Sequence, residues 1–334
     1  MLAKNSAPRG VGSLAEAQAF LDANPDIEAV QLVITDACGV GRGKNVAREE
    51  LAALYGSGRN VAGSILGLDI TGEDVEGTGL VWNVGDADQC CRPVAGSLAR
   101  ASWLKRPSAQ VLGTMYELDG RPSKADPRHA LAGVVARCED AGLTPVVAVE
   151  LEFYLVDRER TPEGHAQPPR QPLTGRREVK TQINSMQELD EYSAVLSAIA
   201  AAAREQDLPV GTVLAEYGPG QFEVNLHHVA DPLLACDHAI RLKRLVKGVA
   251  LQHGMEATFM AKPYRDHAGS GAHLHVSILD TQGRNIFAAE DPAGSELLRH
   301  AIGGLAATMN DAIAICAPTA NSYRRFQPEA YVPL

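Results

Sequence analysis

The sequence has no long uninterrupted run of apolar residues, and basic side chains are fewer than acidic ones. No stretch approaches the roughly 20 apolar residues that a membrane span needs, and residues 1–12 lack the apolar core of a signal peptide. Lysine and arginine number 31 against 41 aspartate and glutamate, a formal net charge of −10. Proteins that bind nucleic acid or anionic membranes need basic patches. We therefore expect a cytoplasmic protein with neither partner.

Cysteine is also sparse. The six cysteines are scattered, and adjacent Cys90 and Cys91 have no second pair at zinc-site spacing, so free thiols in a reducing compartment are the simpler interpretation. Core-forming residues, in contrast, are present in normal amount, because 45% of the 334 residues are hydrophobic and 22% are charged. A chain of this length and composition fits about two domains and argues against wholesale disorder.

Turn signals place a domain boundary near residue 119, which predicts domains at 1–118 and 119–334. The first domain is expected to hold a helix at 14–21, a hairpin at 29–46, a helix at 49–55, and loops with short strands at 63–120. Asp126 and Pro127 then mark a helix start, as cap and first helical residue. Beyond it the expected elements are strands at 145–157, 210–228, 256–263 and 271–280, helices at 188–206, 233–253 and 295–315, and an exposed loop at 161–177. This order predicts an α+β fold with a large sheet.

Two carboxylates share one face of the strand expected at 145–157. Alternation puts Glu150 and Glu152 on the same side of an otherwise apolar run. At ~6–7 Å and an effective dielectric of roughly 20, two anions repel by about 2–3 kcal/mol, so a cation is expected beside them. The alternative is an edge strand whose polar face meets water.

The strand expected at 271–280 carries imidazoles in the same way. His273, His275 and Ser277 project to one side, while Leu274 and Val276 are expected to pack on the other. Histidines at alternate strand positions can bind a metal ion or a phosphate. Taken alone, the pattern is weak, and two surface histidines with satisfied hydrogen bonds are the better interpretation.

A third polar strand follows a forced bend. Gly218-Pro219-Gly220 separates Glu216 from Glu223, so the two carboxylates can approach one site from opposite sides of the bend. Asn225 and His227 then alternate on the face of Glu223. Four carboxylates with imidazoles and without cysteine suit Mg²⁺ or Mn²⁺ better than structural zinc. Ions that link carboxylates to phosphates are typical of ATP chemistry.

These residues lie in motifs that resemble the glutamine synthetase family over the whole chain. The matching segments, in the family's order, are Val149-Glu150-Leu151-Glu152-Phe153, Pro219-Gly220-Gln221-Phe222-Glu223, Lys262-Pro263, residues 269–277, and Asn321-Ser322-Tyr323-Arg324-Arg325. Within the family, the segments at 148–155, 267–271 and 321–328 look most like the γ-glutamylputrescine synthetase (glutamate–polyamine ligase) branch. The resemblance implies an N-terminal β-grasp domain and a catalytic domain with a curved antiparallel sheet flanked by helices.

The resemblance also implies two metal sites. Glu152, Glu216 and Glu223 would hold the ion that touches glutamate and the transferring phosphate. Glu150 and His273 would help to hold a second ion on the ATP phosphates.

Further roles follow from the same resemblance. His275 would stabilise the phosphoryl group in transfer and contact ATP, and Ser277 would lie near the nucleotide. Gly269 would bind substrate glutamate through its backbone, and Arg325 would bind its carboxylate and act in catalysis. Asp69 would supply a catalytic charge across a subunit interface, although a plain loop aspartate fits this position nearly as well.

The implied reaction has two steps. The γ-carboxylate of glutamate attacks ATP to give an acyl phosphate, and an amine then displaces phosphate. Tyr331 stands where ammonia-using members have a glutamate, and an aromatic wall suits an alkylamine such as putrescine. Ordinary glutamine synthesis and a catalytically inactive scaffold are the alternatives, and a metal-dependent hydrolase is a third.

The family also forms stacked hexameric rings, so a homo-oligomer, a dodecamer by resemblance, is expected. Family members continue beyond the position of Leu334 into a segment with another metal-ligand glutamate and two arginines. The sequence is therefore expected to be truncated at its C-terminus, and glutamate-dependent ATP turnover by these residues alone is expected to be severely impaired.

Overall fold

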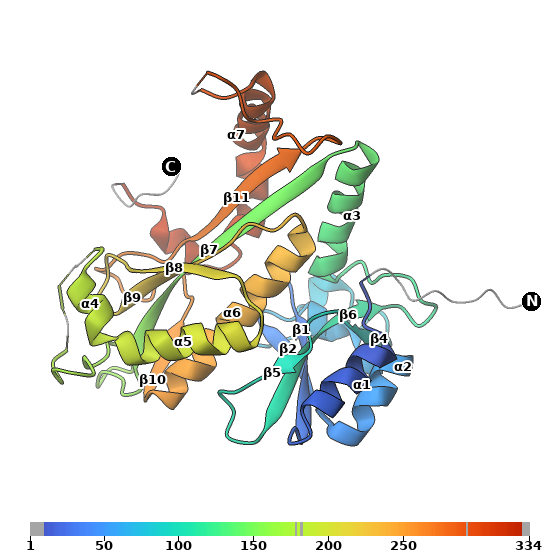
Figure 1. Cartoon of the computed structure of the whole chain (residues 1–334), viewed down its shortest axis with the longest axis horizontal. Helices are drawn as coiled ribbons and strands as arrows, with labels where there is room; N and C mark the ends of the chain where they lie inside the picture. Colours follow the sequence, from blue (N-terminus) through green and yellow to red (C-terminus); the bar gives the residue numbers. More distant parts are fainter. Residues whose placement is uncertain (1–9, 178, 181–182, 292, 329–334) are drawn as a thin grey trace, which may run out of the picture. The chain divides into compact units, whose positions relative to one another are not determined.

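The computed structural model describes residues 10–177, 179–180, 183–291 and 293–328. These residues form two compact units, Met1–Gly133 and Val134–Leu334, and the division falls within helix α3 (Pro127–Asp140) (Figure 1). The predicted domain boundary at 118/119 lies in the turn before this helix and stays a prediction. As predicted, Asp126 caps the start of α3, where its Oδ1 accepts a hydrogen bond from the backbone N–H of Arg128 at 2.8 Å.

The N-terminal unit is built on a six-stranded mixed sheet in the order β2-β1-β6-β4-β3, with β5 paired to β6. β1 runs parallel to β6, and the other pairs are antiparallel. The strands are β1 (Ala29–Thr35), β2 (Gly41–Ala47), β3 (Arg59–Ala62), β4 (Asp88–Pro93), β5 (Ala99–Arg100) and β6 (Ser108–Tyr116). Helices α1 (Leu14–Ala23) and α2 (Leu51–Ser57) contribute Ala17, Leu51 and Leu54 to the core of this unit.

Strand β6 was not predicted, because loops and short strands were expected over 63–120. It is nine residues long and almost wholly buried. The prediction of loops and short strands followed from the glycine, aspartate and proline content of this region. Within the strand, the buried Thr114 hydroxyl finds a partner, because it donates to Asp126 Oδ2 at 2.7 Å. The same carboxylate oxygen accepts the backbone N–H of Met115 at 2.7 Å, so Asp126 ties β6 to the start of α3.

The C-terminal unit holds a five-stranded antiparallel sheet in the order β10-β7-β9-β8, with β11 paired to β7. The strands are β7 (Thr144–Asp157), β8 (Val210–Ala215), β9 (Gln221–Leu226), β10 (Met255–Thr258) and β11 (Ala272–Leu279). The helices are α4 (Met186–Glu191), α5 (Ser193–Glu205), α6 (Pro232–Gln252) and α7 (Glu296–Cys316). Within the described part of the chain, no helix is long and apolar enough to span a bilayer.

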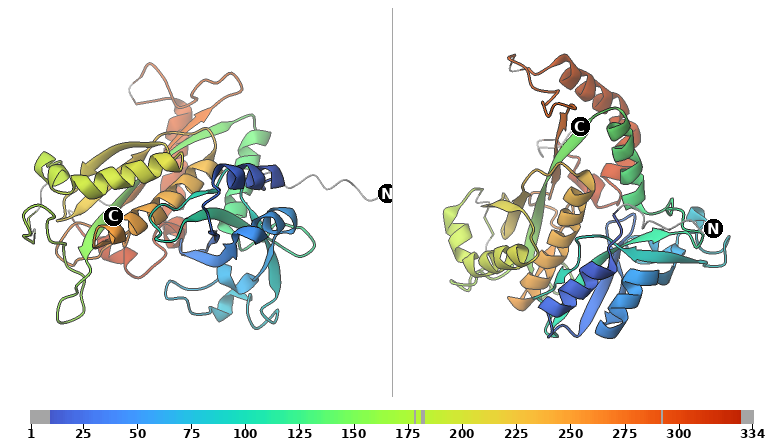
Figure 2. Two further views of the ribbon diagram at one scale, coloured as in Figure 1. Left: turned by 60° about the horizontal axis from the view of Figure 1, so that its bottom comes forward. Right: turned by 45° about the vertical axis from the view of Figure 1, so that its right-hand side comes forward.

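Helices α5 and α6 pack against each other and against this sheet (Figure 2). Phe153 on β7 contacts Phe259, and Lys247 of α6 lies over the Phe259 ring. The odd-numbered residues of β7 therefore face α6. Because side chains alternate along a strand, Glu150 and Glu152 project from the opposite face, which is left free for chemistry.

Two details of the C-terminal unit differ from the prediction. The helix expected at 188–206 is interrupted at Tyr192, a fully buried residue whose ring packs on Phe222 at 5.2 Å between centroids. The expected packing of Leu274 and Val276 is wrong: their side chains are 67% and 50% exposed. β11 pairs with β7 alone among the described strands. No described residue of α7 is buried, so the described part of the chain leaves these two side chains of β11 largely uncovered.

Candidate metal and substrate site

The central polar face of the C-terminal sheet joins three strands that are distant in sequence. The register pairs Glu152 of β7 with Glu223 of β9, and Glu150 of β7 with His273 of β11. Glu150 also lies opposite Asn225 of β9. Neighbouring strands lie about 4.8 Å apart, so this register gathers side chains that the sequence spaces over more than a hundred positions.

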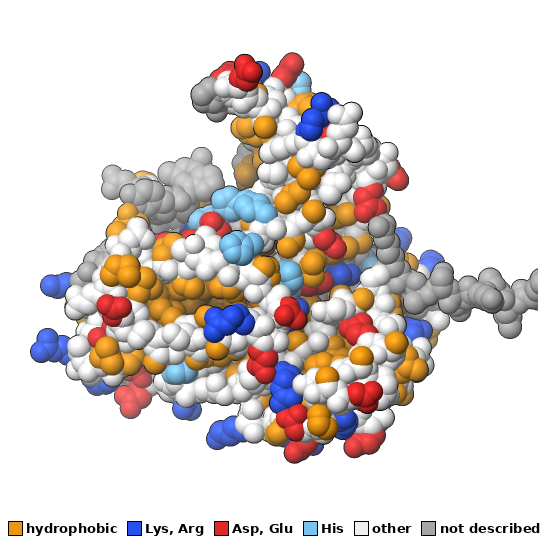
Figure 3. Space-filling model, in the orientation of Figure 1, with side chains coloured by type: hydrophobic (Ala, Val, Ile, Leu, Met, Phe, Trp, Pro, Cys, Tyr) orange, Lys and Arg blue, Asp and Glu red, His pale blue; other side chains and the backbone are white. Residues whose placement is uncertain are grey.

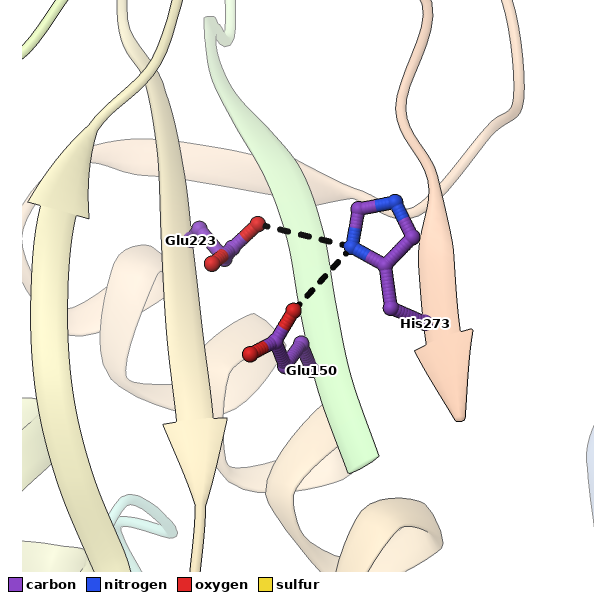
Figure 4. A group of neighbouring side chains, drawn as sticks. All are labelled: Glu150, Glu223 and His273. Carbon is purple, nitrogen blue, oxygen red and sulfur yellow. Dashed lines mark hydrogen bonds and ion pairs between the residues drawn. The ribbon is translucent and has the colours of Figure 1, made fainter. Parts of the chain in front are cut away.

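Three of these side chains form a compact cluster (Figure 4). Nδ1 of His273 lies 3.1 Å from Glu150 Oε2 and 3.9 Å from Glu223 Oε2. One ligand atom from each of the three residues lies within 4.8 Å of the others. Two carboxylates and one imidazole are donors that Mg²⁺ and Mn²⁺ accept, so this cluster fits a divalent cation. Figure 3 shows histidine side chains gathered on the open surface near β11.

Asn225 and His275 complete the surroundings of Glu150. The amide Nδ2 of Asn225 donates to Glu150 Oε1 at 2.6 Å and to Glu223 Oε1 at 3.1 Å, so one neutral donor links the two carboxylates. His275 Nε2 lies 3.1 Å from Glu150 Oε1. Alternation along the strand had placed Asn225 on the face of Glu223 but had given it no role. Its bridging role depends on the strand register, which the sequence does not reveal.

The carboxylates titrate differently because their surroundings differ. Burial, followed by the negative charge of Glu150, raises the pKa of Glu223 above its ordinary value. Burial and the charge of Glu152 raise the pKa of Glu216 in the same way. Burial acts on Glu150 too, but hydrogen bonds from His275 and Asn225 outweigh it and hold the pKa of Glu150 below its usual range. The face thus carries more negative charge than its own donors neutralise, a condition that a bound cation relieves.

Glu152 and Glu216 extend this face beyond the compact cluster. Glu152 Oε2 accepts the backbone N–H of Gly271 at 2.9 Å. Glu216 lies at the start of the Gly-Pro-Gly bend, where its backbone N–H donates to the carbonyl of Gln221 at 2.8 Å. The charges of Glu152 and Glu223 both act on Glu216. The bend therefore brings Glu216 towards the other carboxylates, as its glycines predicted.

A cavity of about 180 Å³ adjoins Glu152 and is lined also by Ser270, Gly271 and Arg325. A Cβ added to Gly269 would lie 2.9 Å from Arg325 Nε, so only glycine lets the guanidinium come this close. Arg325 ends a short 3₁₀ helix, Ser322–Arg325. An anionic ligand in this cavity would meet the guanidinium on one side and the backbone of residues 269–271 on the other.

Asn321 fastens the segment that carries Arg325. Its Oδ1 accepts the backbone N–H of Lys262 at 2.7 Å, and its Nδ2 donates to the carbonyl of Lys262 at 2.9 Å. The pair of hydrogen bonds fixes the start of the 3₁₀ helix to the chain leading into residues 263–270. Sequence matching had found Asn321 as part of a motif without a function.

Three other predicted residues lie outside this cluster. Ser277 is farther along β11, opposite Val146. Asp69 belongs to the N-terminal unit, where its Oδ1 accepts hydrogen bonds from the backbone N–H groups of Thr71 and Gly72 at 2.8 and 2.9 Å. Tyr331 lies outside the described residues. The roles expected for Ser277, Asp69 and Tyr331 stay predictions.

Comparisons with known proteins identify the family to which the chain is similar. Residues 124–334 match the family model described as "Glutamine synthetase, catalytic domain". The chain is 41% identical over 325 residues to "Gamma-glutamylputrescine synthetase PuuA" of Escherichia coli (strain K12), covering 97% of this chain and 69% of that protein. It is 31% identical over 307 residues to "Glutamate--isopropylamine ligase" of Pseudomonas sp, covering 90% of this chain and 65% of that protein. The chain thus spans about two thirds of the length of these relatives.

A solved structure supports the same conclusion about the fold. The chain superposes with a TM-score of 0.78 and 28% identity on a structure titled "GmaS/ADP complex-Conformation 1". The match covers 94% of this chain and 67% of the other.

Proposed function

The chain belongs to the glutamine synthetase family, and we propose that the protein ligates the γ-carboxylate of glutamate to an amine with consumption of ATP. Family membership also establishes the predicted catalytic fold, with its curved sheet and flanking helices. The observation that carries the proposal is the convergence of Glu150, Glu223 and His273 from three strands within 4.8 Å.

The carboxylate face is assigned to divalent cations. One ion is assigned to Glu150, His273 and Glu223. A second ion is assigned to Glu152, Glu216 and Glu223. Mg²⁺ or Mn²⁺ would supply charge neutralisation for the triphosphate. Contacts from His275 and Asn225 to Glu150 Oε1 hold this carboxylate beside His273 and Glu223, where its charge faces the proposed ion. His275 is assigned to the phosphoryl group, with Ser277 near the nucleotide.

Glutamate is assigned to the cavity beside Glu152. The Arg325 guanidinium binds a carboxylate of the substrate, and the backbone at Gly269 fixes its position. The γ-carboxylate then attacks the terminal phosphate of ATP, which releases ADP and leaves γ-glutamyl phosphate. An amine nitrogen attacks the acyl carbon, phosphate departs, and the excess proton on nitrogen goes to solvent or a neighbouring base.

The amine is assigned to an alkylamine of the putrescine type. Two observations support this choice: Tyr331 replaces the acidic residue expected for ammonia, and the relative at 41% identity is named a γ-glutamylputrescine synthetase. Other relatives are named for isopropylamine, ethanolamide and glutamine, so the family accommodates several nucleophiles.

The remaining assignments concern the whole protein. The N-terminal sheet is assigned to a β-grasp domain spanning residues 1–118, and residues 119–334 to the catalytic domain. A homo-oligomer, a dodecamer by analogy, would let Asp69 contribute to a neighbouring subunit's site. A cytoplasmic location is proposed because ATP and glutamate are cytoplasmic metabolites.

An amine panel tests the proposed reaction. Full-length protein with ATP, glutamate and Mg²⁺ is offered putrescine, spermidine, isopropylamine, ethanolamine or ammonia, and phosphate release is measured while mass spectrometry identifies the amide. We expect glutamate-dependent turnover that is fastest with a diamine. Glu150→Gln should abolish it, whereas Glu290→Gln, which changes an exposed carboxylate, should not. A preference for ammonia would refute the amine assignment, and turnover that needs no glutamate would refute the ligase.

A further inference from the structure

Gln221 lies directly after the Gly-Pro-Gly bend, at the first position of β9, and its side chain is 1% exposed. Its Oε1 accepts the backbone N–H of Gly218 at 2.9 Å. Its Nε2 donates to Glu152 Oε2 at 3.2 Å and to the carbonyl of Gly269 at 3.0 Å. One buried amide thus contacts the bend, a carboxylate of the metal face and the loop assigned to glutamate.

These partners determine the orientation of the amide. The N–H of Gly218 can only donate, so it must face the amide oxygen, and the NH₂ group must face Glu152 and Gly269. The two protons of that group have a carboxylate oxygen and a carbonyl oxygen as their nearest acceptors, and the Ser270 hydroxyl oxygen lies farther away at 3.5 Å. A glutamate at this position would place a second carboxylate against Glu152, and an asparagine is one methylene shorter.

The contact with Gln221 affects how Glu152 presents its carboxylate. Oε2 accepts from Gln221 and from the backbone N–H of Gly271 at 2.9 Å. A Cβ added to Gly271 would lie 3.0 Å from Glu152 Oε1, so the carboxylate lies close against this glycine. With Oε2 engaged by two donors, Oε1 is the oxygen left for a further ligand.

The loop at 268–271 is fixed from the same strands. Tyr154, the residue that pairs with Gln221 across β7 and β9, donates its hydroxyl to the carbonyl of Ala268 at 2.8 Å. Gln221 takes the next carbonyl, that of Gly269. Two neighbouring side chains therefore hold two consecutive carbonyls of one loop.

We propose that Gln221 is a positioning residue that couples the cation ligand Glu152 to the glutamate-binding backbone at Gly269. The inference rests on the proposed function for the identity of the ligands. A change at Glu152 on cation binding is transmitted through one amide to Gly269, and a change at Gly269 is transmitted back. Such coupling is reciprocal, so glutamate and Mn²⁺ should each tighten the binding of the other.

Three proteins test the coupling: wild type, Gln221→Met and Gln221→Asn. Methionine keeps the volume and removes both polar ends, while asparagine keeps the amide and shortens its reach. Calorimetry measures Mn²⁺ binding with and without glutamate, and steady-state kinetics gives KM for glutamate and for ATP. Thermal unfolding monitors the fold of each protein.

For Gln221→Met we expect Mn²⁺ affinity to fall about tenfold or more, as when outer-shell partners of metal ligands are removed. We also expect KM for glutamate to rise about tenfold and KM for ATP to change less than about twofold. The effect of glutamate on Mn²⁺ affinity should shrink to the part that direct contact between the ion and glutamate supplies. For Gln221→Asn, the Mn²⁺ affinity and the KM for glutamate should lie between the values of wild type and Gln221→Met. A merely structural role would lower the unfolding temperature while leaving Mn²⁺ affinity and the ratio of the two KM values unchanged, and that result would overturn the proposal.

The design also separates this inference from the proposed reaction. If Gln221→Met does not fold, the same measurements on Gln221→Asn decide the question. If wild type forms no γ-glutamyl amide, the proposed function fails, but the Mn²⁺ titrations with and without glutamate still test the coupling.

Discussion

Replacing Glu223 by glutamine should stabilise the metal-free protein and at the same time weaken its cation binding. The Glu223 side chain is 9% exposed, and burial and the charge of Glu150 raise its pKa. A carboxyl with a raised pKa in the folded state contributes stability below its unfolded pKa and loses that contribution as pH rises through the folded pKa. At neutral pH the metal-free wild type therefore carries the cost of a charge that glutamine lacks.

The size of this cost follows from the geometry. Two unit charges 4.8 Å apart, the upper limit for the ligand atoms of the cluster, repel by about 3 kcal/mol at an effective dielectric of about 20. The hydrogen bonds that Asn225 donates to Glu150 and Glu223 offset part of this repulsion. A net gain of about 1–2 kcal/mol is expected for Glu223→Gln, within the range of single substitutions that relieve an unpaired buried charge. The glutamine carbonyl can still accept from Asn225, so the packing is preserved.

Urea unfolding with and without Mn²⁺ measures both effects. In EDTA at pH 7.5, Glu223→Gln should have the higher free energy of unfolding, and the difference should shrink at pH 5 as the wild-type carboxyl takes up its proton. Mn²⁺ at a hundred times its Kd should stabilise wild type by about 2.7 kcal/mol and the variant by much less. Glu290→Gln serves as the control and should stay within about 0.5 kcal/mol of wild type. A variant less stable than wild type in EDTA at pH 7.5, or one with the full Mn²⁺ increment, would refute the reasoning.

Three further predictions concern stability. Asp126→Ala should cost about 2–4 kcal/mol in urea unfolding, because three buried or capping donors lose their acceptor; a loss under 1 kcal/mol would contradict it. Gly218→Ala should cost about 1–3 kcal/mol, since the added Cβ would lie 1.9 Å from the Tyr154 hydroxyl oxygen, and adding Tyr154→Phe should recover part of the loss. Burial alone would raise the pKa of Asp157, but hydrogen bonds from the backbone of Glu159 and the side chain of Arg177 outweigh it and lower the pKa. The ionised Asp157 carboxylate therefore stabilises the fold at neutral pH, and this stabilisation is lost as pH falls through the folded-state pKa. Arg177→Gln should therefore narrow the stability difference between pH 7 and pH 3, and an unchanged pH profile would count against this account.

Strand periodicity was sufficient to predict part of the site. The alternation at Glu150 and Glu152, and at His273 and His275, placed each pair correctly on one face of a strand. The Gly-Pro-Gly bend correctly brought Glu216 towards the face of Glu223. These predictions succeeded because each depends on local geometry alone.

Features that depend on pairing between strands could not be predicted. The bridging role of Asn225 requires the register that places it opposite Glu150, and the role of Gln221 requires the approach of Gly269. The length of strand β6 was missed because the glycine, aspartate and proline content of residues 63–120 favoured loops and short strands. The partner that its Thr114 finds in Asp126 forms only on folding. The side chains of Leu274 and Val276 were expected to be buried, but they are exposed. Alternation shows which side chains share a face of a strand, but it does not show whether another element packs on that face.

The two N–H donors on one oxygen of Glu152 bear on the choice of ion. A carboxylate with two N–H donors on one oxygen has its other oxygen more available, so binding of one ion by both oxygens is disfavoured. Ca²⁺ is large and often binds both oxygens of a carboxylate, whereas Mg²⁺ usually binds one oxygen of a carboxylate and retains several water ligands. On the proposed assignment of Glu152 as a cation ligand, these two hydrogen bonds would therefore favour Mg²⁺ over the larger Ca²⁺.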